Sequence, residues 1–500
     1  MSNDLCVQTR DGTVRGRRDE AGVLRFQGLP FAAAPVGPLR FRPPAPVAPW
    51  PDVRDATAPG PVAPQERPAA STNPMDEDCL CLNVTTPAAD GARRPVLVYI
   101  HAGAFITGAG SAEAYSGVQL ACDHGLVVVS INYRLGVLGF PPFAVAPGAP
   151  QNLGLLDQIA ALEWVRDNIA AFGGDPDCVT VCGYSAGGWS IAALMAMPQA
   201  RGLFHRAAPQ SGGFMYAMSP AGQARHARAI AQAMGDAAPD IDRLMAASVD
   251  ELLRIQAETV AGWQAATADE QVVELDFPFT PVCDGITLAE HPLASVAEGK
   301  GADVPLLVGS TGNELGAAPF RMALPWLRKT YSRESLGAAI GSLGGDADGI
   351  WQAYAARHPG EDEQALAGRI RSDWMYRIPA IRLAEGRAAS PQRAWMYRFD
   401  LPAVSAEIGG ISTHATDVTF WFGSMDQSPY QMFFFGRAPT EPERALSLRM
   451  QADLAFFART GTCEWPAYDL ARRTTMIYDL ETRPLDDPDG GERWLWGGVV

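Results

Sequence analysis

The chain offers one serine whose surroundings suit nucleophilic chemistry. A stretch that reads VTVCGYSAGG places Gly183 and Gly187 on either side of Ser185, at the G-x-S-x-G spacing. A β-branched run, 179–181, precedes this motif, and an apolar stretch of helical character, 189–197, follows it. We expect a strand, a sharp turn and a helix, with the hydroxyl held at the helix N-terminus, where free N–H groups favour a developing oxyanion. The same pattern also occurs in ordinary glycine-rich loops, so the assignment depends on partners.

A serine nucleophile needs hydrogen-bond donors for the oxyanion. The stretch HAGAF, which starts at His101, ends an apolar run with small residues. The backbone N–H groups of Gly103 and Ala104 are therefore candidates to bind a substrate oxygen, together with the N–H of Ala186. A tight loop without a ligand is the alternative interpretation of this stretch.

The general base that takes the proton of the serine is most often a histidine, and the chain contains seven. His414 follows two glycines late in the chain and precedes an aromatic segment, 420–422, which fits the order serine, acid, histidine. His205 closely follows the motif helix, and His101 opens the candidate oxyanion loop. Four others lie in polar or helical segments typical of a surface: His124, His226, His291 and His358. Taken alone, a loop histidine such as His414 is more often a packing residue.

The elements that must position these residues alternate between strands and helices, which predicts an α/β protein with a mostly parallel sheet. We expect strands at 96–101, 126–132, 179–184, 304–309 and 394–399, helices at 155–169 and 442–459, and a terminal strand at 475–480. One domain over 1–500 fits this pattern better than separate modules. It would carry a proline-rich extended segment at about 30–74 and helical insertions at about 217–274 and 320–390.

Composition excludes several classes of function. The net charge of -16 argues against binding to nucleic acid or to an anionic membrane surface. The longest apolar runs have the length of strands, so no membrane segment is expected. Eight cysteines without paired C-x₂-C blocks indicate neither a disulfide scaffold nor a metal site, and we expect no cofactor. Residues 1–10 lack a secretory signal, which favours a cytoplasmic protein.

Several blocks of the sequence resemble the carboxylesterase/cholinesterase family of α/β-hydrolases, also called type B carboxylesterases. These blocks occur in order along nearly the whole chain: FQGLPFA at 26–32, GPLRF at 37–41, EDCLCLNV at 77–84, NYRLG at 132–136, NLGLLDQ at 152–158, FGGDP at 172–176 and QSG at 210–212. The resemblance implies the α/β-hydrolase fold, in which helices flank a large, mostly parallel central sheet.

The resemblance also implies roles for single residues. It makes Ser185 the nucleophile, His414 the general base and Glu314 the acid that orients the histidine. Asp417 is the second choice for the acid. Ser211 would be a further hydroxyl near these residues. The reaction implied is ester hydrolysis through an acyl-enzyme.

Two structural ion pairs follow from the resemblance as well. It pairs Arg40 with Glu77 and Arg134 with Asp175. The chain departs from the family's pattern at Tyr184, where a glutamate commonly precedes the nucleophile, and at alanines in the oxyanion loop, where glycines are usual.

The resemblance gives a substrate class but not a substrate. Leu275 and Phe277 fall near the acyl pocket of the family, which favours apolar or aromatic small-molecule esters. No tryptophan stands where cholinesterases bind choline, so a choline ester is not expected.

An amide or carbamate hydrolase would use the same three residues, and a non-catalytic binding protein is the alternative from another class. A monomer or a small homo-oligomer is expected.

Overall fold

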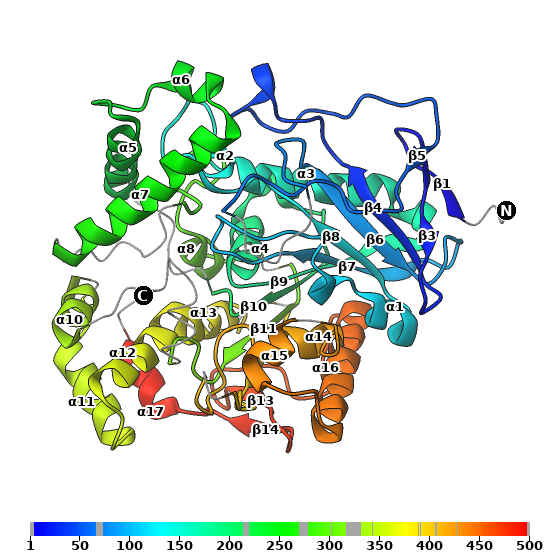
Figure 1. Cartoon of the computed structure of the whole chain (residues 1–500). Coiled ribbons are helices and arrows are strands. Elements are labelled where there is room, and N and C mark those ends of the chain that lie inside the picture. Colours follow the sequence, from blue (N-terminus) through cyan, green and yellow to red (C-terminus); the bar gives the residue numbers. More distant parts are fainter. Residues whose placement is uncertain are drawn as a thin grey trace.

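A long twisted sheet runs through the centre of the molecule and positions the candidate residues (Figure 1). The computed structural model describes residues 5–66, 74–213, 220–269, 279–301, 303–316, 332–342, 344–388, 390, 392–405, 408–427 and 429–497. Within them, eleven strands follow one another across the sheet in this order: β14 (Arg483–Asp486), β13 (Thr474–Tyr478), β12 (Ala394–Phe399), β11 (Leu306–Thr311), β10 (Arg206–Gln210), β9 (Gly174–Tyr184), β7 (Arg94–Ile100), β8 (Val127–Ile131), β6 (Cys81–Thr86), β4 (Leu24–Pro30) and β3 (Arg17–Arg18).

The middle of this sheet is parallel, from β13 to β8. Every residue of β8 and of β11 is buried, as expected for strands covered on both faces. The edges are antiparallel: β8 pairs with β6 and β6 with β4, while β13 pairs with β14. The strand predicted at 475–480 is present as β13. It is not the terminal strand, because the chain turns back and adds the antiparallel strand β14 beside it.

Helices cover both faces of the sheet (Figure 1). On one face α3 (Leu153–Asn168) and α4 (Ala186–Ala196) pack on the central strands, and on the other α1 (Val118–His124) and α16 (Glu441–Thr460) do so. The predicted helices at 155–169 and 442–459 are therefore present. A capping box between Thr440 and Glu443 fixes the start of α16.

The remaining elements lie outside these layers. A small sheet consists of β1 (Cys6–Gln8), β2 (Thr13–Arg15) and β5 (Arg54–Asp55). The region predicted to be helical at 217–274 contains α5 (Pro220–Met234), α6 (Ile241–Ala246) and α7 (Val249–Asp269). The region 320–390 contains α10 (Arg333–Ser342), α11 (Ala347–Arg357), α12 (Glu363–Ser372), the π-helix η7 (Asp373–Arg377) and α13 (Ile378–Glu385). Shorter helices are α2 (Gly136–Gly139), α8 (Pro292–Ala297), α14 (Val418–Phe422), α15 (Pro429–Phe435), α17 (Gly490–Arg493), η2 (Gly37–Leu39), η3 (Glu113–Tyr115), η4 (Ile169–Phe172), η5 (Pro198–Ala200) and η8 (Trp494–Trp496). The division into one domain with two insertions stays a prediction.

The described part of the proline-rich segment is extended, apart from η2, and lies over the core. It buries Phe31 and Phe41, while Leu39 and Trp50 remain partly exposed. Burial of these aromatic rings fixes the segment to the sheet instead of leaving it as a linker.

One of the two expected ion pairs is present and the other is wrong. Arg40 Nε donates to Glu77 Oε2 at 2.9 Å, and both side chains are buried. Arg134 instead binds Asp157 of α3, with Nη2 2.6 Å from Oδ1 and Nε 2.8 Å from Oδ2. Asp175 lies at the start of β9, whereas Arg134 follows the end of the parallel strand β8. The two residues therefore lie at opposite edges of the sheet, and Asp175 pairs with Arg93.

Of the helices described, none is long and apolar enough to cross a membrane. In the same part of the chain, no group of three or more side chains is arranged to hold a metal ion. All eight cysteines are free thiols, including the buried Cys79 and Cys81.

Candidate active site

Ser185 lies in a tight turn between β9 and α4, as the motif predicts. Its backbone angles, φ 54° and ψ -123°, belong to a region that side chains rarely adopt, which marks a strained turn. A Cβ at Gly183 would lie 2.6 Å from the carbonyl oxygen of Ile100, and one at Gly187 would lie 2.1 Å from the same oxygen. The two glycines are thus needed because strand β7 passes directly beside the turn. The half-buried Ser185 is left at the carboxyl edge of the sheet.

The loop after β7 lies at the same edge, because β7 and β9 are parallel neighbours. Three consecutive residues have positive φ: Gly103 at 118°, Ala104 at 52° and Phe105 at 62°. A Cβ at Gly103 would lie 2.0 Å from the carbonyl oxygen of Thr107, so only glycine fits there. No hydrogen bond between described residues uses the N–H of Gly103 or Ala104. These two donors and the N–H of Ala186, the first residue of α4, remain available for a ligand.

His101 stabilises this loop. Its ring is buried and stacks on Tyr133 with centroids 4.3 Å apart, and its Nδ1 lies 2.8 Å from the carbonyl oxygen of Ala102. Burial lowers the pKa of His101 to about 4, so the ring is neutral near pH 7. The hydroxyl of Tyr133 donates to the carbonyl oxygen of His101 at 2.9 Å. These contacts hold the loop and leave His101 no role as a base.

His414 and Glu314 meet in the interior. Nδ1 of His414 lies 2.5 Å from Oε2 of Glu314, and both side chains are buried. The other carboxylate oxygen, Oε1, accepts hydrogen bonds from Ser211 Oγ at 2.6 Å and from the N–H of Thr311 at 2.7 Å. A carboxylate that accepts from Nδ1 fixes the tautomer of the imidazole, so that Nε2 is the ring nitrogen with the lone pair that can take a proton.

Tyr184 links the pair of His414 and Glu314 to the turn at Ser185. It is the last residue of β9 and directly precedes Ser185. Its ring centroid lies 5.7 Å from that of His414 and 6.4 Å from that of Tyr115. Burial raises the pKa of the Tyr184 phenol well above its usual value, and neighbouring phenols add to this shift, so the side chain is neutral. An uncharged ring therefore lies next to Ser185 and the imidazole of His414.

Asp417 is buried nearby but has other partners. Its Oδ2 accepts from Trp421 Nε1 at 3.1 Å and from the Tyr397 hydroxyl at 3.3 Å. Burial, and next the charge of Glu314, raises the pKa of Asp417 to about 6. Of the two carboxylates considered for the orienting role, Glu314 is the one in contact with the Nδ1 atom.

The raised pKa of Asp417 predicts a pH-dependent effect on stability. The carboxylate ionises near 3.8 when unperturbed and near 6 in the folded protein, so ionisation disfavours the fold. The associated stability is complete below about pH 4 and is lost as the pH rises through 6. Asp417→Asn keeps an acceptor for Trp421 and removes the charge. We expect it to stabilise the protein by about 3 kcal/mol at pH 8 and by far less at pH 4.5, measured by thermal unfolding. An equal effect at both pH values would contradict the assignment.

The structure also tests the remaining candidates. Leu275 and Phe277 lie outside the described residues. His226, expected at the surface, is buried in α5, because that helix turns this face inward against the neighbouring helix α7. The other three histidines of that group are half-buried. The sequence analysis missed Tyr376, whose ring centroid lies 4.8 Å from that of His414. No local motif surrounds Tyr376, so only the fold could reveal this contact.

Several known proteins are similar to this chain in sequence and in fold. The model of a family described as "Carboxylesterase family" matches residues 3–484. A para-nitrobenzyl esterase of Bacillus subtilis (strain 168) is 37% identical over 499 residues, 97% of each chain. A phenmedipham hydrolase of Pseudarthrobacter oxydans is 35% identical over 463 residues, 88% of this chain and 87% of the other. A solved structure described as a thermophylic PNB esterase superposes with a TM-score of 0.86 at 36% identity, over the whole of both chains.

Proposed function

Since this chain belongs to the carboxylesterase family, has the α/β-hydrolase fold and is a serine carboxylesterase, we propose that Ser185, His414 and Glu314 form its catalytic triad. The observation that carries this proposal is the 2.5 Å contact between His414 Nδ1 and Glu314 Oε2, in a buried pair next to the strained turn of Ser185. Ser211 supports the pair by donating to Glu314.

The geometry leads to a two-step reaction. Ser185 Oγ attacks the ester carbonyl while His414 takes its proton, and Glu314 stabilises the imidazolium that forms. The N–H groups of Gly103, Ala104 and Ala186 bind the oxyanion. His414 then gives the proton to the leaving alcohol, and the acyl group stays on Ser185. Water repeats the sequence, which releases the acid and regenerates the serine.

The substrate class we propose is apolar or aromatic esters of small size. The name of one relative, a para-nitrobenzyl esterase, supports it, and a second relative is a phenmedipham hydrolase. The name of the phenmedipham hydrolase keeps carbamate hydrolysis as an alternative use of the same triad. Amines leave less readily than alcohols without prior protonation, so an amide bond is the slowest of the three substrates for this geometry.

A substrate panel tests this proposal. The active serines are first counted by titration with an aryl phosphonate, and turnover is then measured for an aryl ester, an aryl carbamate and an anilide of matched size. We expect kcat/KM for the ester to exceed that for the anilide by at least about 100-fold, with the carbamate between them. Faster turnover of the carbamate or the anilide than of the ester would reassign the substrate class.

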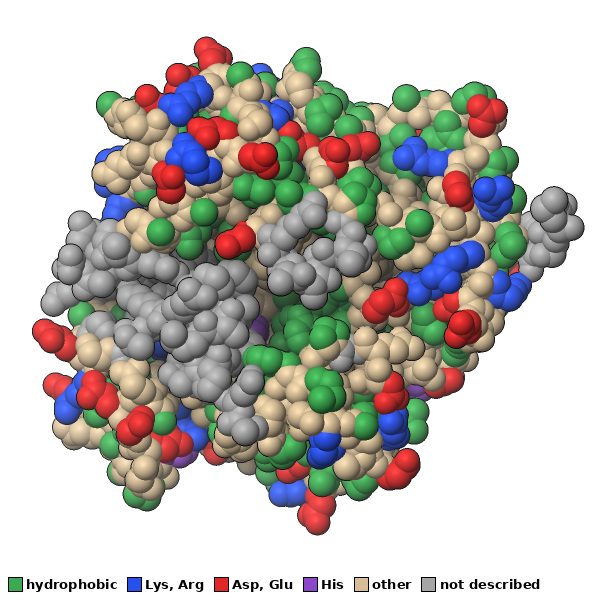
Figure 2. Space-filling view, in the orientation of Figure 1, with side chains coloured by type: hydrophobic (Ala, Val, Ile, Leu, Met, Phe, Trp, Pro, Cys, Tyr) green, Lys and Arg blue, Asp and Glu red, His purple; other side chains and the backbone are tan. Residues whose placement is uncertain are grey.

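We also propose that the protein acts in the cytoplasm, as a monomer or small homo-oligomer. Eight free thiols, including the buried Cys79 and Cys81, the second of which begins β6, suit a reducing compartment. Basic side chains on the face shown in Figure 2 are interspersed with acidic ones, and the net charge is -16. This distribution supports a small molecule as the partner instead of nucleic acid or an anionic membrane.

A further inference from the structure

The helical segment between 363 and 385 contains a π-helical turn at Asp373–Arg377, between α12 and α13. Such turns add a residue to the helix and re-aim the side chains, and they are common at functional sites. All five residues of this turn are buried. The side chains of the turn therefore contact other parts of the protein on each side.

One side of the turn contacts the active site. The ring centroid of Tyr376 lies 4.8 Å from that of His414, with the two planes inclined by 46°. The ring of Trp189 of α4 also lies beside Tyr376, with centroids 6.3 Å apart and planes inclined by 30°. The ring of Tyr184 lies 5.7 Å from that of His414. Two aromatic rings from different elements thus lie beside the imidazole.

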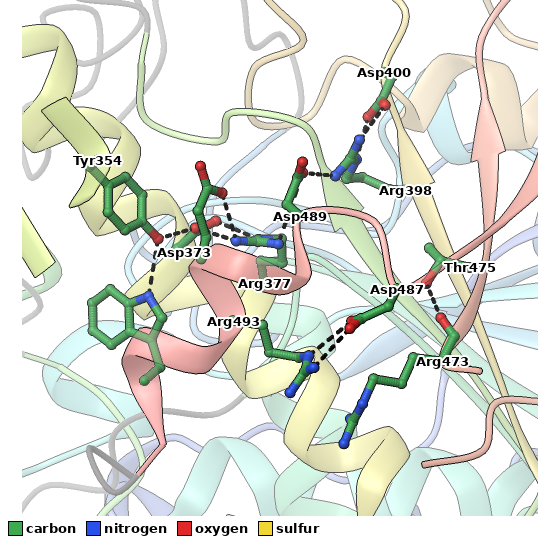
Figure 3. A network of polar contacts seen from close by, with 12 residues as sticks. Tyr354, Asp373, Arg377, Arg398, Asp400, Arg473, Thr475, Asp487, Asp489 and Arg493 are labelled. Atoms are coloured by element: carbon green, nitrogen blue, oxygen red, sulfur yellow. Dashed lines mark hydrogen bonds and ion pairs between the residues drawn. The ribbon is translucent and has the colours of Figure 1, made fainter. Parts of the chain in front are cut away.

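The other side of the turn is fixed by a buried polar network (Figure 3). Arg377 Nε donates to Asp373 Oδ1 at 2.6 Å, and its Nη2 donates to Glu492 of α17 at 3.1 Å. The hydroxyl of Tyr354 donates to Asp373, and Trp496 Nε1 donates to that hydroxyl at 3.0 Å. Buried charges that are paired in this way hold one geometry, because any other leaves a charge unpaired.

The same helical segment also supports the acid. Ser372, the last residue of α12, accepts a hydrogen bond from the N–H of Leu315 at 2.8 Å, and its hydroxyl lies 3.1 Å from Asn313 Oδ1. These two residues flank Glu314 in sequence. One segment therefore contacts the base through Tyr376 and the loop of the acid through Ser372.

We propose that Tyr376 is a positioning residue for His414, held against the imidazole by the π-helical turn. The inference rests on the proposed role of His414 as the base. Among the described residues, the groups around the imidazole include Glu314 at Nδ1, the rings of Tyr184 and Tyr376, and the more distant carboxyl of Asp417. A ring packed against the imidazole restricts its tilt, and small errors in the placement of a base reduce the rate strongly.

Two substitutions at this position separate the ring from the hydroxyl. Tyr376→Met removes the ring and keeps most of the apolar volume. We expect kcat for a short-chain p-nitrophenyl ester to fall roughly tenfold with KM changed less than about twofold, because the ester still binds but the base is misplaced. Tyr376→Phe keeps the ring and should retain most of the wild-type kcat.

Two further variants separate a failure of the positioning role from a failure of the proposed triad. Tyr478→Met removes another fully buried tyrosine ring, in β13, and should lower the melting temperature without lowering kcat. His414→Ala tests the proposed function itself: residual activity near wild type would overturn the triad, whatever Tyr376 does. If His414→Ala is inactive and Tyr376→Met keeps full kcat, the positioning role is wrong and the triad stands. A loss of kcat of about tenfold or more in Tyr376→Phe would also overturn it, because that variant keeps the ring, and this measurement does not depend on whether Tyr376→Met folds.

Discussion

Replacing Ser185 by alanine should reduce kcat for a short-chain p-nitrophenyl ester by a factor of about 10⁴ to 10⁶, with the fold unchanged. The loss follows because no other hydroxyl occupies the strained position at the start of α4, next to the donors of the loop after β7. Since alanine accepts the same backbone angles no worse than serine, the melting temperature should stay within a few degrees of wild type. The measurement is initial-rate kinetics on protein whose folding is checked by circular dichroism.

An aryl phosphonate provides the matched control for this loss. The wild-type protein should bind one equivalent covalently, and peptide mapping should place the adduct on Ser185. The alanine variant should bind none. Ester hydrolysis that survives in the variant, or an adduct on another residue, would remove Ser185 from the mechanism.

The second large effect concerns the acid. Glu314→Ala should lower kcat by about 10³ to 10⁴, because the imidazole loses the carboxylate that fixes its tautomer and stabilises its charged form. Asp417→Ala should cost less than about tenfold, since the Asp417 carboxylate binds Trp421 and Tyr397 instead of Nδ1. Both variants are assayed with the same ester at pH 8.

The pair of variants distinguishes the two carboxylates directly. Glu314→Gln serves as a further control, because the amide preserves the size of the side chain but not its charge. If the Asp417 variant alone loses activity, the orienting acid is Asp417 and the contact at 2.5 Å has no catalytic role.

Local patterns in the sequence predicted the parts of the site that depend on neighbouring residues. The turn at Ser185 and the loop at Gly103 were predicted because glycines at fixed spacings report a backbone that only small residues allow. Runs of β-branched residues likewise predicted the central strands. The pairing of Glu314 with His414 came from the resemblance to a family, since nothing near either residue in the sequence indicates the other.

Features that depend on distant parts of the chain were predicted poorly. Arg134 was assigned the wrong partner because the pair was taken from the family resemblance, although Arg134 follows one predicted parallel strand and Asp175 precedes another. The antiparallel edge strand β14 was missed because it is short and exposed. Tyr376 was missed because its function depends on a helix turn that meets His414 only after the chain has folded.

The loops of the site leave the sheet at the carboxyl ends of β7, β9 and β11, and the base comes still later in the chain. More than two hundred residues separate Ser185 from His414. At a synthesis rate of about 5–20 residues per second, Ser185 leaves the ribosome on the order of 10 s or more before His414. During that interval the serine hydroxyl has no partner to take its proton. If the proposed triad is correct, we expect the nascent chain to be unreactive toward esters and toward phosphonates, with reactivity arising together with completion of the fold.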